Sequence, residues 1–234
     1  MSNKIEQLNK DTHKKVKLKP NTDFSHLENQ HMAPVVIHEF GSVATELPIV
    51  FVKNELNNDE FMAVAMLGLK ENENLLVKDK KWVGYYLPAS FTHYPLSLMP
   101  NPEDNNQYII HIISDSECVN EKEGEALFNE DGSETEFFTS HRQALENLFM
   151  AARATVEFVK TLSEMDMFEA RTINFAVGED KRSVTGVYTI NFDKFNQLGE
   201  KEFNILKEKG YLSAIFAHFI SINQIQRLIN RIND

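Results

Sequence analysis

The densest run of apolar positions in the chain lies between residues 46 and 96. Ile49 to Val52 is an uninterrupted β-branched and aromatic run that begins directly after a proline, which predicts a strand buried on both faces. A polar turn follows, and Phe61 to Leu69 returns as a second apolar run, so the simplest arrangement is an antiparallel hairpin. Asn74 to Val77 and Trp82 to Leu87 would extend it as a meander.

Other apolar segments predict further strands. Val35 to Ile37 is a short strand, and Tyr108 to Ile113 is a longer one with His111 as its single polar interruption. Residues 171–177 and 185–191 are two strands joined by a polar turn, which again indicates a hairpin.

An Asp-Gly pair between two apolar segments predicts one more hairpin. Asp131-Gly132 separates residues 126–128 from residues 136–138, and glycine supplies the positive φ that such a turn needs. Asp131, Glu134 and Glu136 also raise a calcium-binding alternative, but their spacing does not match an EF-hand loop, so the hairpin is favoured.

Helical periodicity appears in the second half of the chain. Apolar residues recur every three or four positions from Ser140 to about Met165, with Thr139 or Ser140 available as the N-cap. Residues 201–209 predict a helix that ends at a glycine, and residues 212–229 predict a strongly amphipathic closing helix.

Together these elements predict an α+β fold: an antiparallel β-meander or hairpin-rich sheet with one long helix and a C-terminal helical pair. Six lysines lie within the first 20 residues, and residues 1–30 are expected to form a flexible basic N-terminal arm. Residues 31–234 are expected to form a single domain, because the hairpin at 171–191 needs a sheet to join.

Charge and cysteine content narrow the class of protein. The net charge of −11 argues against binding nucleic acid or an anionic membrane as the main activity, because both need a basic surface. No window approaches the roughly 18 to 20 apolar residues of a membrane helix, and no signal peptide is recognisable. With the single Cys118, these features predict a cytoplasmic protein without membrane insertion.

Catalytic signatures are absent from the sequence. It has no phosphate-binding glycine loop, no HExxH and no G-x-S-x-G motif. Glu46, Glu125 and His93 are weak catalytic candidates, although turn capping or ion pairing with Arg153 or Arg171 is the favoured role for the two glutamates. Several histidines could converge with Glu39 or Glu46 on iron, but structural roles for His111 and His218 are favoured. We therefore predict no metal and no cofactor.

One short segment is unusually rich in aromatic rings that carry polar tips. Such rings suit a ligand pocket or a partner interface, although the edge of a core would show the same composition. The predicted ligand-binding or partner-binding residues are Trp82, Tyr85, Tyr86, Phe91, His93 and Tyr94.

Four ordered blocks of sequence resemble the SapC family of bacterial proteins, which is named for a link to surface-layer systems. The blocks are ELPIVF with the downstream tryptophan and Tyr-Pro close, Gly124-Glu125-Ala126-Leu127-Phe128 with Asp131-Gly132, Gly186-Val187-Tyr188-Thr189-Ile190, and Gly210-Tyr211-Leu212 with Ser221. The resemblance spans roughly residues 31–231. Where the family usually has two arginines, this chain has Thr92-His93, so an anion-binding role for those arginines does not carry over.

Two functions remain open from the sequence. The favoured one is a non-catalytic binding or accessory protein, linked by the resemblance to surface-layer or envelope systems, whose partner is a protein or a small ligand. The alternative is a small-molecule or peptide-modifying enzyme with a site around residues 82–95, which predicts a deep pocket with convergent polar groups. Exposed apolar residues on the closing helix would indicate a homodimer.

Overall fold

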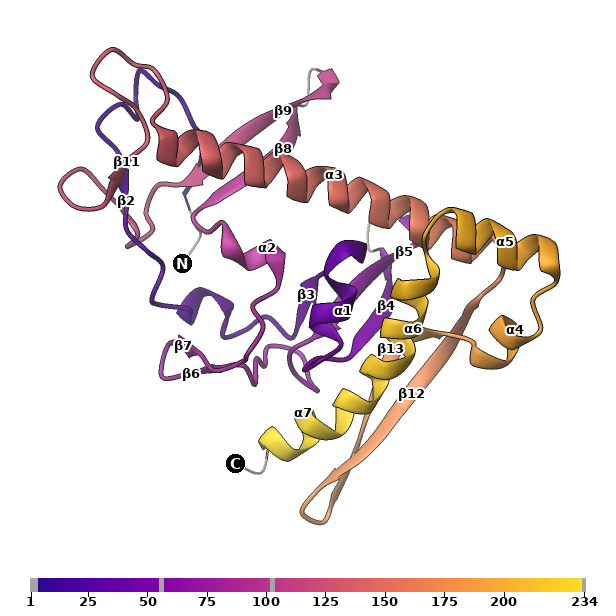
Figure 1. Cartoon of the computed structure of the whole chain (residues 1–234). Coiled ribbons are helices and arrows are strands. Elements are labelled where there is room, and N and C mark those ends of the chain that lie inside the picture. The colour runs from indigo at the N-terminus through magenta and orange to yellow at the C-terminus, as the bar shows by residue number, and fades with distance from the viewer. Residues whose placement is uncertain (1–3, 55–56, 102–103, 233–234) are drawn as a thin grey trace. The chain divides into compact units, whose positions relative to one another are not determined.

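A computed structural model describes residues 4–54, 57–101 and 104–232. The chain divides into two compact units: a first unit of Met1–Thr22 and Phe91–Met150, and a second of Asp23–Ser90 and Ala151–Asp234. Helices and antiparallel sheets are mixed in the sequence order that was predicted, so the α+β class is confirmed (Figure 1). The boundaries predicted at residues 1–30 and 31–234 stay a prediction.

The second unit is built on a five-stranded antiparallel sheet in the order β12-β13-β4-β5-β3. Its strands are β3 (Met32–Pro34), β4 (Ile49–Asn54), β5 (Asn57–Met66), β12 (Phe168–Val177) and β13 (Asp180–Ile190). The predicted hairpins of β4 with β5 and of β12 with β13 are both present. Residues 55 and 56 of the predicted turn between β4 and β5 lie outside the described residues. Ile49, Val50 and Phe51 are all buried, as expected for a strand covered on both faces.

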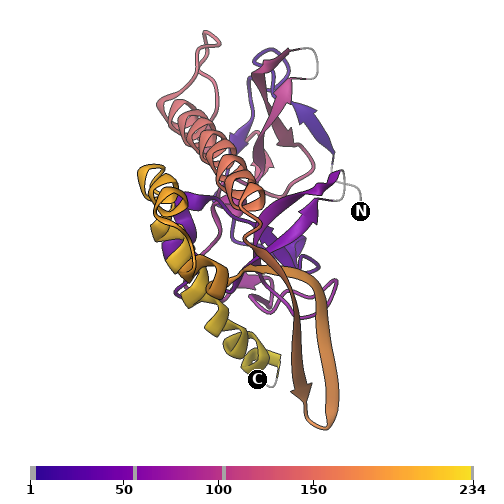
Figure 2. The same cartoon turned by 90° about the vertical axis from the view of Figure 1, so that its right-hand side faces the viewer.

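Most of the β12–β13 hairpin extends past the edge of β4. Only Val187 and Tyr188 of β13 pair with β4, so the two strands continue beyond the sheet as a two-stranded ribbon (Figure 2). Ile173 faces Val184 across this ribbon, which keeps a short apolar stripe on one side of it.

The shorter helices of this unit are α1 (Phe40–Val43), α4 (Phe192–Asn196), α5 (Glu200–Glu208), α6 (Leu212–Ser221) and α7 (Ile225–Ile232). Of these, α6 contacts β4 and β13, and α7 contacts β12. Gly210 has a φ of +73° between α5 and α6, in agreement with the predicted helix end. The single closing helix predicted at 212–229 is interrupted by a 3₁₀ turn at Ile222–Gln224. Among the described residues, no helix is long and apolar enough to cross a membrane.

His218 joins α6 to the sheet. Its Nε2 accepts a hydrogen bond from the Ile190 N–H at 3.0 Å, and its Nδ1–H donates to the Ile49 carbonyl at 2.9 Å. The side chain is fully buried, and burial lowers the pKa of His218 to about 4. The neutral ring therefore connects β13 to β4 through α6, which is the structural role predicted for this histidine.

The predicted meander after β5 is wrong. Residues 74–87 contribute only β6 (Val77–Lys78) and β7 (Lys81–Trp82), which pair with each other in a separate two-stranded sheet. In this segment a backbone group is bonded to a side chain and not to a neighbouring strand: the Leu76 N–H donates to the Asn74 carboxamide oxygen at 2.9 Å. The strand predicted at 35–37 is also displaced, because β3 ends at Pro34 and Ile37–Glu39 is a 3₁₀ turn.

The first unit contains two three-stranded sheets, in the orders β1-β9-β8 and β10-β2-β11. Their strands are β1 (Ile5–Gln7), β2 (Lys17–Leu18), β8 (Leu96–Asn101), β9 (Asp104–Ile113), β10 (Val119–Asn120) and β11 (Glu125–Ala126). The basic N-terminal segment thus supplies β1 and β2, and its Val16 and Leu18 are buried in a cluster with Leu96 and Ile112. The short helix α2 (Ala89–Thr92) leads into β8.

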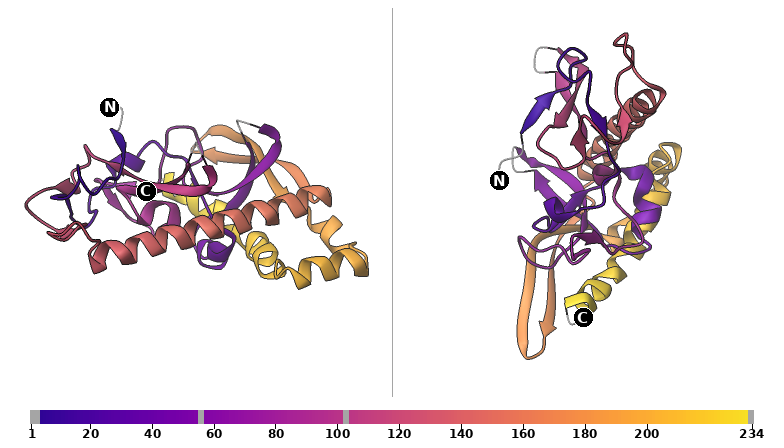
Figure 3. Two further views of the ribbon diagram at one scale, coloured as in Figure 1. Left: turned by 90° about the horizontal axis from the view of Figure 1, so that it is seen from above. Right: turned by 90° about the vertical axis from the view of Figure 1, so that its left-hand side faces the viewer.

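Helix α3 (Glu136–Glu164) is a long continuous helix (Figure 3). It begins four residues before the predicted start. The Thr135 hydroxyl accepts from the Phe138 N–H at 3.2 Å and caps the helix, in place of Thr139 or Ser140. Phe137 and Phe138 are therefore helical, and the predicted second strand of the Asp-Gly hairpin is wrong. The turn of that hairpin remains: the Asn129 N–H donates to the Ser133 carbonyl at 2.8 Å, and an isolated bridge joins Phe128 to Glu134.

The low pKa of His218 predicts a pH-dependent stability. The unfolded chain protonates this histidine near its ordinary pKa of 6.5, whereas the folded chain does so near 4, so the stabilisation is complete above about pH 6.5 and is lost as the pH falls toward 4. This group alone should lower the free energy of unfolding by roughly 2 kcal/mol between pH 7.5 and pH 5. Urea unfolding of His218→Gln should show a correspondingly flatter pH dependence than the wild type. Identical pH slopes for the two proteins would contradict this account.

Candidate functional site

Glu46 lies at the entrance to β4 and is 1% exposed. Its Oε2 accepts hydrogen bonds from the N–H groups of Tyr85 at 2.7 Å and Tyr86 at 3.0 Å, and its Oε1 pairs with Arg231 Nη2 at 2.9 Å. A buried carboxylate needs partners of this kind because removing its hydration is costly. Glu46 therefore joins the start of β4, a loop and helix α7, and Arg231 takes the place of the ion-pair partners proposed from the sequence.

Glu39 holds the same loop from a second position. Its Oε2 accepts from the Tyr86 hydroxyl at 2.7 Å and from the Ala89 N–H at 2.9 Å, while its Oε1 accepts from the Val36 N–H at 2.8 Å. Burial, together with this carboxylate, raises the pKa of Tyr86 far above its ordinary value. Tyr86 therefore stays a neutral phenol that donates to Glu39.

Residues 82–89, called here the 82–89 loop, are further constrained by close packing. Trp82 Nε1 donates to the Tyr86 carbonyl at 3.1 Å. A Cβ on Gly84 would lie 2.8 Å from Trp82 Nε1 and 3.1 Å from Glu46 Oε2, so only glycine fits there without a shift. The loop backbone is thus held by the β6–β7 pairing at its start, at Trp82, and by buried side chains from Tyr85 to Ala89.

Tyr85 is the outermost side chain of this loop. It is 93% exposed, and Val83 beside it is exposed as well, although the Tyr85 N–H is held by the buried Glu46. Trp82 and Tyr86 are half-buried. The structure therefore presents one aromatic ring to solvent on a fixed backbone.

The other predicted aromatic residues belong to the first unit. Phe91 is buried, and His93 and Tyr94 are half-buried. The six residues predicted as one binding set are therefore divided, with Trp82, Tyr85 and Tyr86 in the second unit.

His93 and Glu125 both lie near His141, a residue that the sequence analysis did not single out. The ring centroids of His93 and His141 are 6.4 Å apart, and burial together with the neighbouring His141 lowers the pKa of His93. Glu125 and His141 line a hollow of about 540 Å³ together with Glu136, Phe137 and Ser140. Placing the helix start at Glu136 would have revealed that Phe137 and His141 share one helix face.

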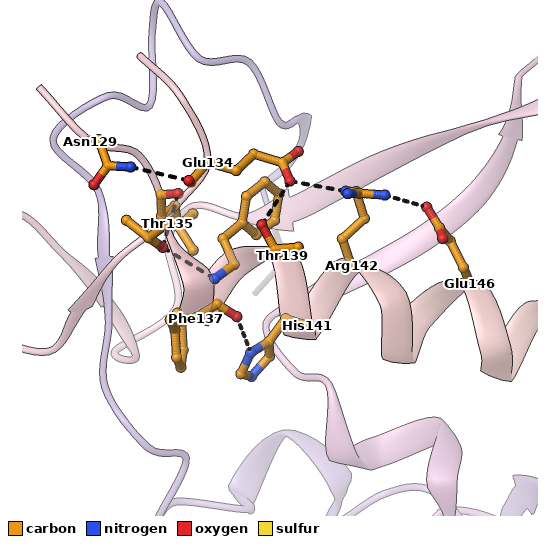
Figure 4. Close-up of polar contacts among 10 residues, drawn as sticks. Asn129, Glu134, Thr135, Phe137, Thr139, His141, Arg142 and Glu146 are labelled. Atoms are coloured by element: carbon orange, nitrogen blue, oxygen red, sulfur yellow. Dashed lines mark hydrogen bonds and ion pairs between the residues drawn. The ribbon is translucent and has the colours of Figure 1, made fainter. Parts of the chain in front are cut away.

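The close-up in Figure 4 shows how this helix start is held. His141 Nδ1 lies 3.0 Å from the Phe137 carbonyl, which can only accept, so Nδ1–H is the donor of this bond. Glu134 binds Arg142 Nε at 3.0 Å, and Arg142 Nη1 binds Glu146 at 2.8 Å (Figure 4). The ring of His141 is therefore oriented by its own helix.

Within residues 4–54, 57–101 and 104–232, no group of three or more histidine, cysteine and acidic side chains is arranged to hold a metal ion. His111 was one of the histidines that could have converged on an iron site. Its Nδ1 lies 3.2 Å from the Ile109 carbonyl, to which it can donate a hydrogen bond.

The geometry around Glu46 predicts a structural role for its ion pair. Arg231→Met should lower the free energy of unfolding by roughly 3 kcal/mol, because it leaves a buried carboxylate without its cation. Arg227→Met is the matched control: it lies on the same helix, is exposed, and bonds only the Thr45 carbonyl at 3.1 Å, so its cost should be below about 1 kcal/mol. Urea unfolding measures both. If the two variants lose the same free energy of unfolding, the ion pair of Arg231 with Glu46 does not stabilise the fold more than the hydrogen bond of Arg227 does.

Comparison with known proteins identifies the family. The family model named SapC matches residues 8–228. Neither a curated protein nor a solved structure matches the chain. The match covers nearly the whole chain and includes both buried glutamates, the 82–89 loop and Arg227, and on this basis the chain belongs to the SapC family.

Proposed function

We propose that this protein is a non-catalytic binding or accessory protein of a surface-layer or envelope system, and that a protein partner contacts the 82–89 loop at Tyr85 and Val83. The observation that carries the proposal is the combination of a 93% exposed tyrosine ring with a backbone fixed by a buried carboxylate. The protein acts in this way from the cytoplasm, as its sequence predicts.

Pre-organisation is the physical reason to favour binding. Ordering a loop when a partner docks costs free energy, and a loop that is already fixed avoids that cost. Tyrosine is among the residues that most often dominate the free energy of binding in protein interfaces, because its ring is large, rigid and amphipathic. A tyrosine displayed without covering contacts therefore suits a partner that supplies a pocket for it.

The positions of the acidic groups also support binding over the enzyme alternative. At the 82–89 loop, both oxygens of Glu46 and both oxygens of Glu39 accept hydrogen bonds or an ion pair. Neither carboxylate has an oxygen free of these contacts with which to take a proton from a substrate. The net charge of −11 further supports a protein partner over a nucleic acid.

The proposal predicts that removal of the Tyr85 ring weakens partner binding without affecting the fold. A partner isolated from host extract on the full-length wild-type protein would be purified, and its Kd measured by calorimetry. Tyr85→Ala should raise the Kd by at least about 30-fold, the effect of an interface residue worth about 2 kcal/mol. Tyr85→Phe should retain most of the affinity.

Met62→Ala serves as the matched control, since Met62 is an exposed apolar residue of the same unit outside the loop. Its Kd should equal that of the wild type, and thermal unfolding of all variants should be unchanged. A Kd that is the same for Tyr85→Ala and the wild type would overturn the proposed contact.

A further inference from the structure

A second apolar surface lies on the C-terminal helices of the second unit. Phe216 and Ile220 of α6 are 49% and 61% exposed, and Phe192 of α4 and Phe203 of α5 are 55% and 38% exposed. We call these four side chains the aromatic face. The three helices that carry it lie together in the fold (Figures 1 and 3).

The aromatic face is supported from beneath by further phenylalanine rings. Phe195 is buried and meets Phe216 edge to face, with ring centroids 5.6 Å apart. Phe219 meets Phe192 in the same way at 5.1 Å. These contacts hold the exposed rings in place, so the face is a firm surface.

Helix α6 is anchored on the opposite side. His218 lies two residues from both Phe216 and Ile220, which places it across the helix from them, and it is the residue that bonds to β4 and β13. The exposure of Phe216 and Ile220 therefore follows from a fixed rotation of the helix.

Helix α6 and the residues that flank it carry no Asp, Glu, Lys or Arg, in contrast to α4 and α5. Residues 211–226 form a run of 16 residues without Asp, Glu, Lys or Arg, in a chain whose net charge is −11. Two acidic chains repel each other wherever charged surfaces meet, but this cost is small where the facing surfaces are uncharged. A charged partner would find no complementary group on α6.

We propose that the aromatic face is the interface of a two-fold symmetric dimer, and that its occupant is a second copy of this chain. Phe216 and Ile220 stand one helical turn apart, and rows at this spacing on two α6 helices can interdigitate. The α6 part of the face is uncharged and apolar, and such a surface is complementary to itself, as a two-fold interface requires.

The area of the face fits such a dimer. Taking about 200 Å² for a fully exposed side chain of this size, the four residues leave roughly 400 Å² of apolar surface in water. Two copies would bury roughly 800 Å², and with the usual polar rim the total would be about 1,300 Å². This value lies within the range of about 1,200–2,000 Å² of stable interfaces.

The test is the mass of the full chain in solution. Sedimentation equilibrium over a dilution series should give twice the chain mass of 26.9 kDa for the wild type. Phe216→Glu combined with Ile220→Glu should give the single-chain mass, with the dimer dissociation constant raised at least about 30-fold. Both side chains are exposed, so the circular dichroism and thermal unfolding of this variant should match the wild type.

Met62→Glu is the control, because it places a glutamate on an exposed apolar residue of β5 that belongs neither to the aromatic face nor to the 82–89 loop, and it should remain dimeric. Added sodium chloride should not dissociate the wild-type dimer, because apolar contact is not screened by salt. A wild type that sediments at 26.9 kDa throughout the series, or a double-glutamate variant that stays dimeric, would overturn the proposal. Binding of a monomeric wild type to phosphatidylcholine vesicles would assign the face to a lipid surface instead.

Discussion

The second unit depends on a charge that is buried and fully partnered. Glu46 is almost inaccessible to water, and an isolated carboxylate in that position would be strongly unfavourable. Its partners come from the 82–89 loop and from Arg231, which is 185 residues away in sequence. The start of the central strand, the loop and the last helix are therefore stabilised together, because the loss of either partner would leave the same charge exposed to a low-dielectric interior.

The same constraint explains why the 82–89 loop is not a strand. Its residues have the composition of a strand, but the N–H groups of Tyr85, Tyr86 and Ala89 donate to Glu46 and Glu39. A backbone N–H that is bonded to a side chain is not available to a neighbouring strand. The carboxylates thus decide both the shape of the loop and the outward direction of Tyr85.

The sequence predicts elements well where backbone groups bond to each other, and poorly where a side chain bonds to the backbone. Strands β4 and β5 were predicted because long apolar or β-branched runs require burial whatever the details of their partners. Strands β12 and β13 were predicted because two β-prone runs flank a polar turn. The prediction failed where a side chain competes with the backbone, at the 82–89 loop and at Thr135, which starts α3 four residues early. The pairing of Glu46 with Arg231 was beyond reach, because nothing local to either residue indicates a partner so distant in sequence.

Helix α6 shows that amphipathicity alone does not say which apolar residues are covered. Its sequence is apolar on nearly every side, so periodicity predicts burial for Phe216 as readily as for Ile215, yet Ile215 is buried and Phe216 is half exposed. The two hydrogen bonds of His218 fix the rotation of the helix, and that rotation turns Phe216 and Ile220 away from the sheet. One buried polar residue therefore stabilises the unit and at the same time determines which apolar surface remains available for contact with another molecule.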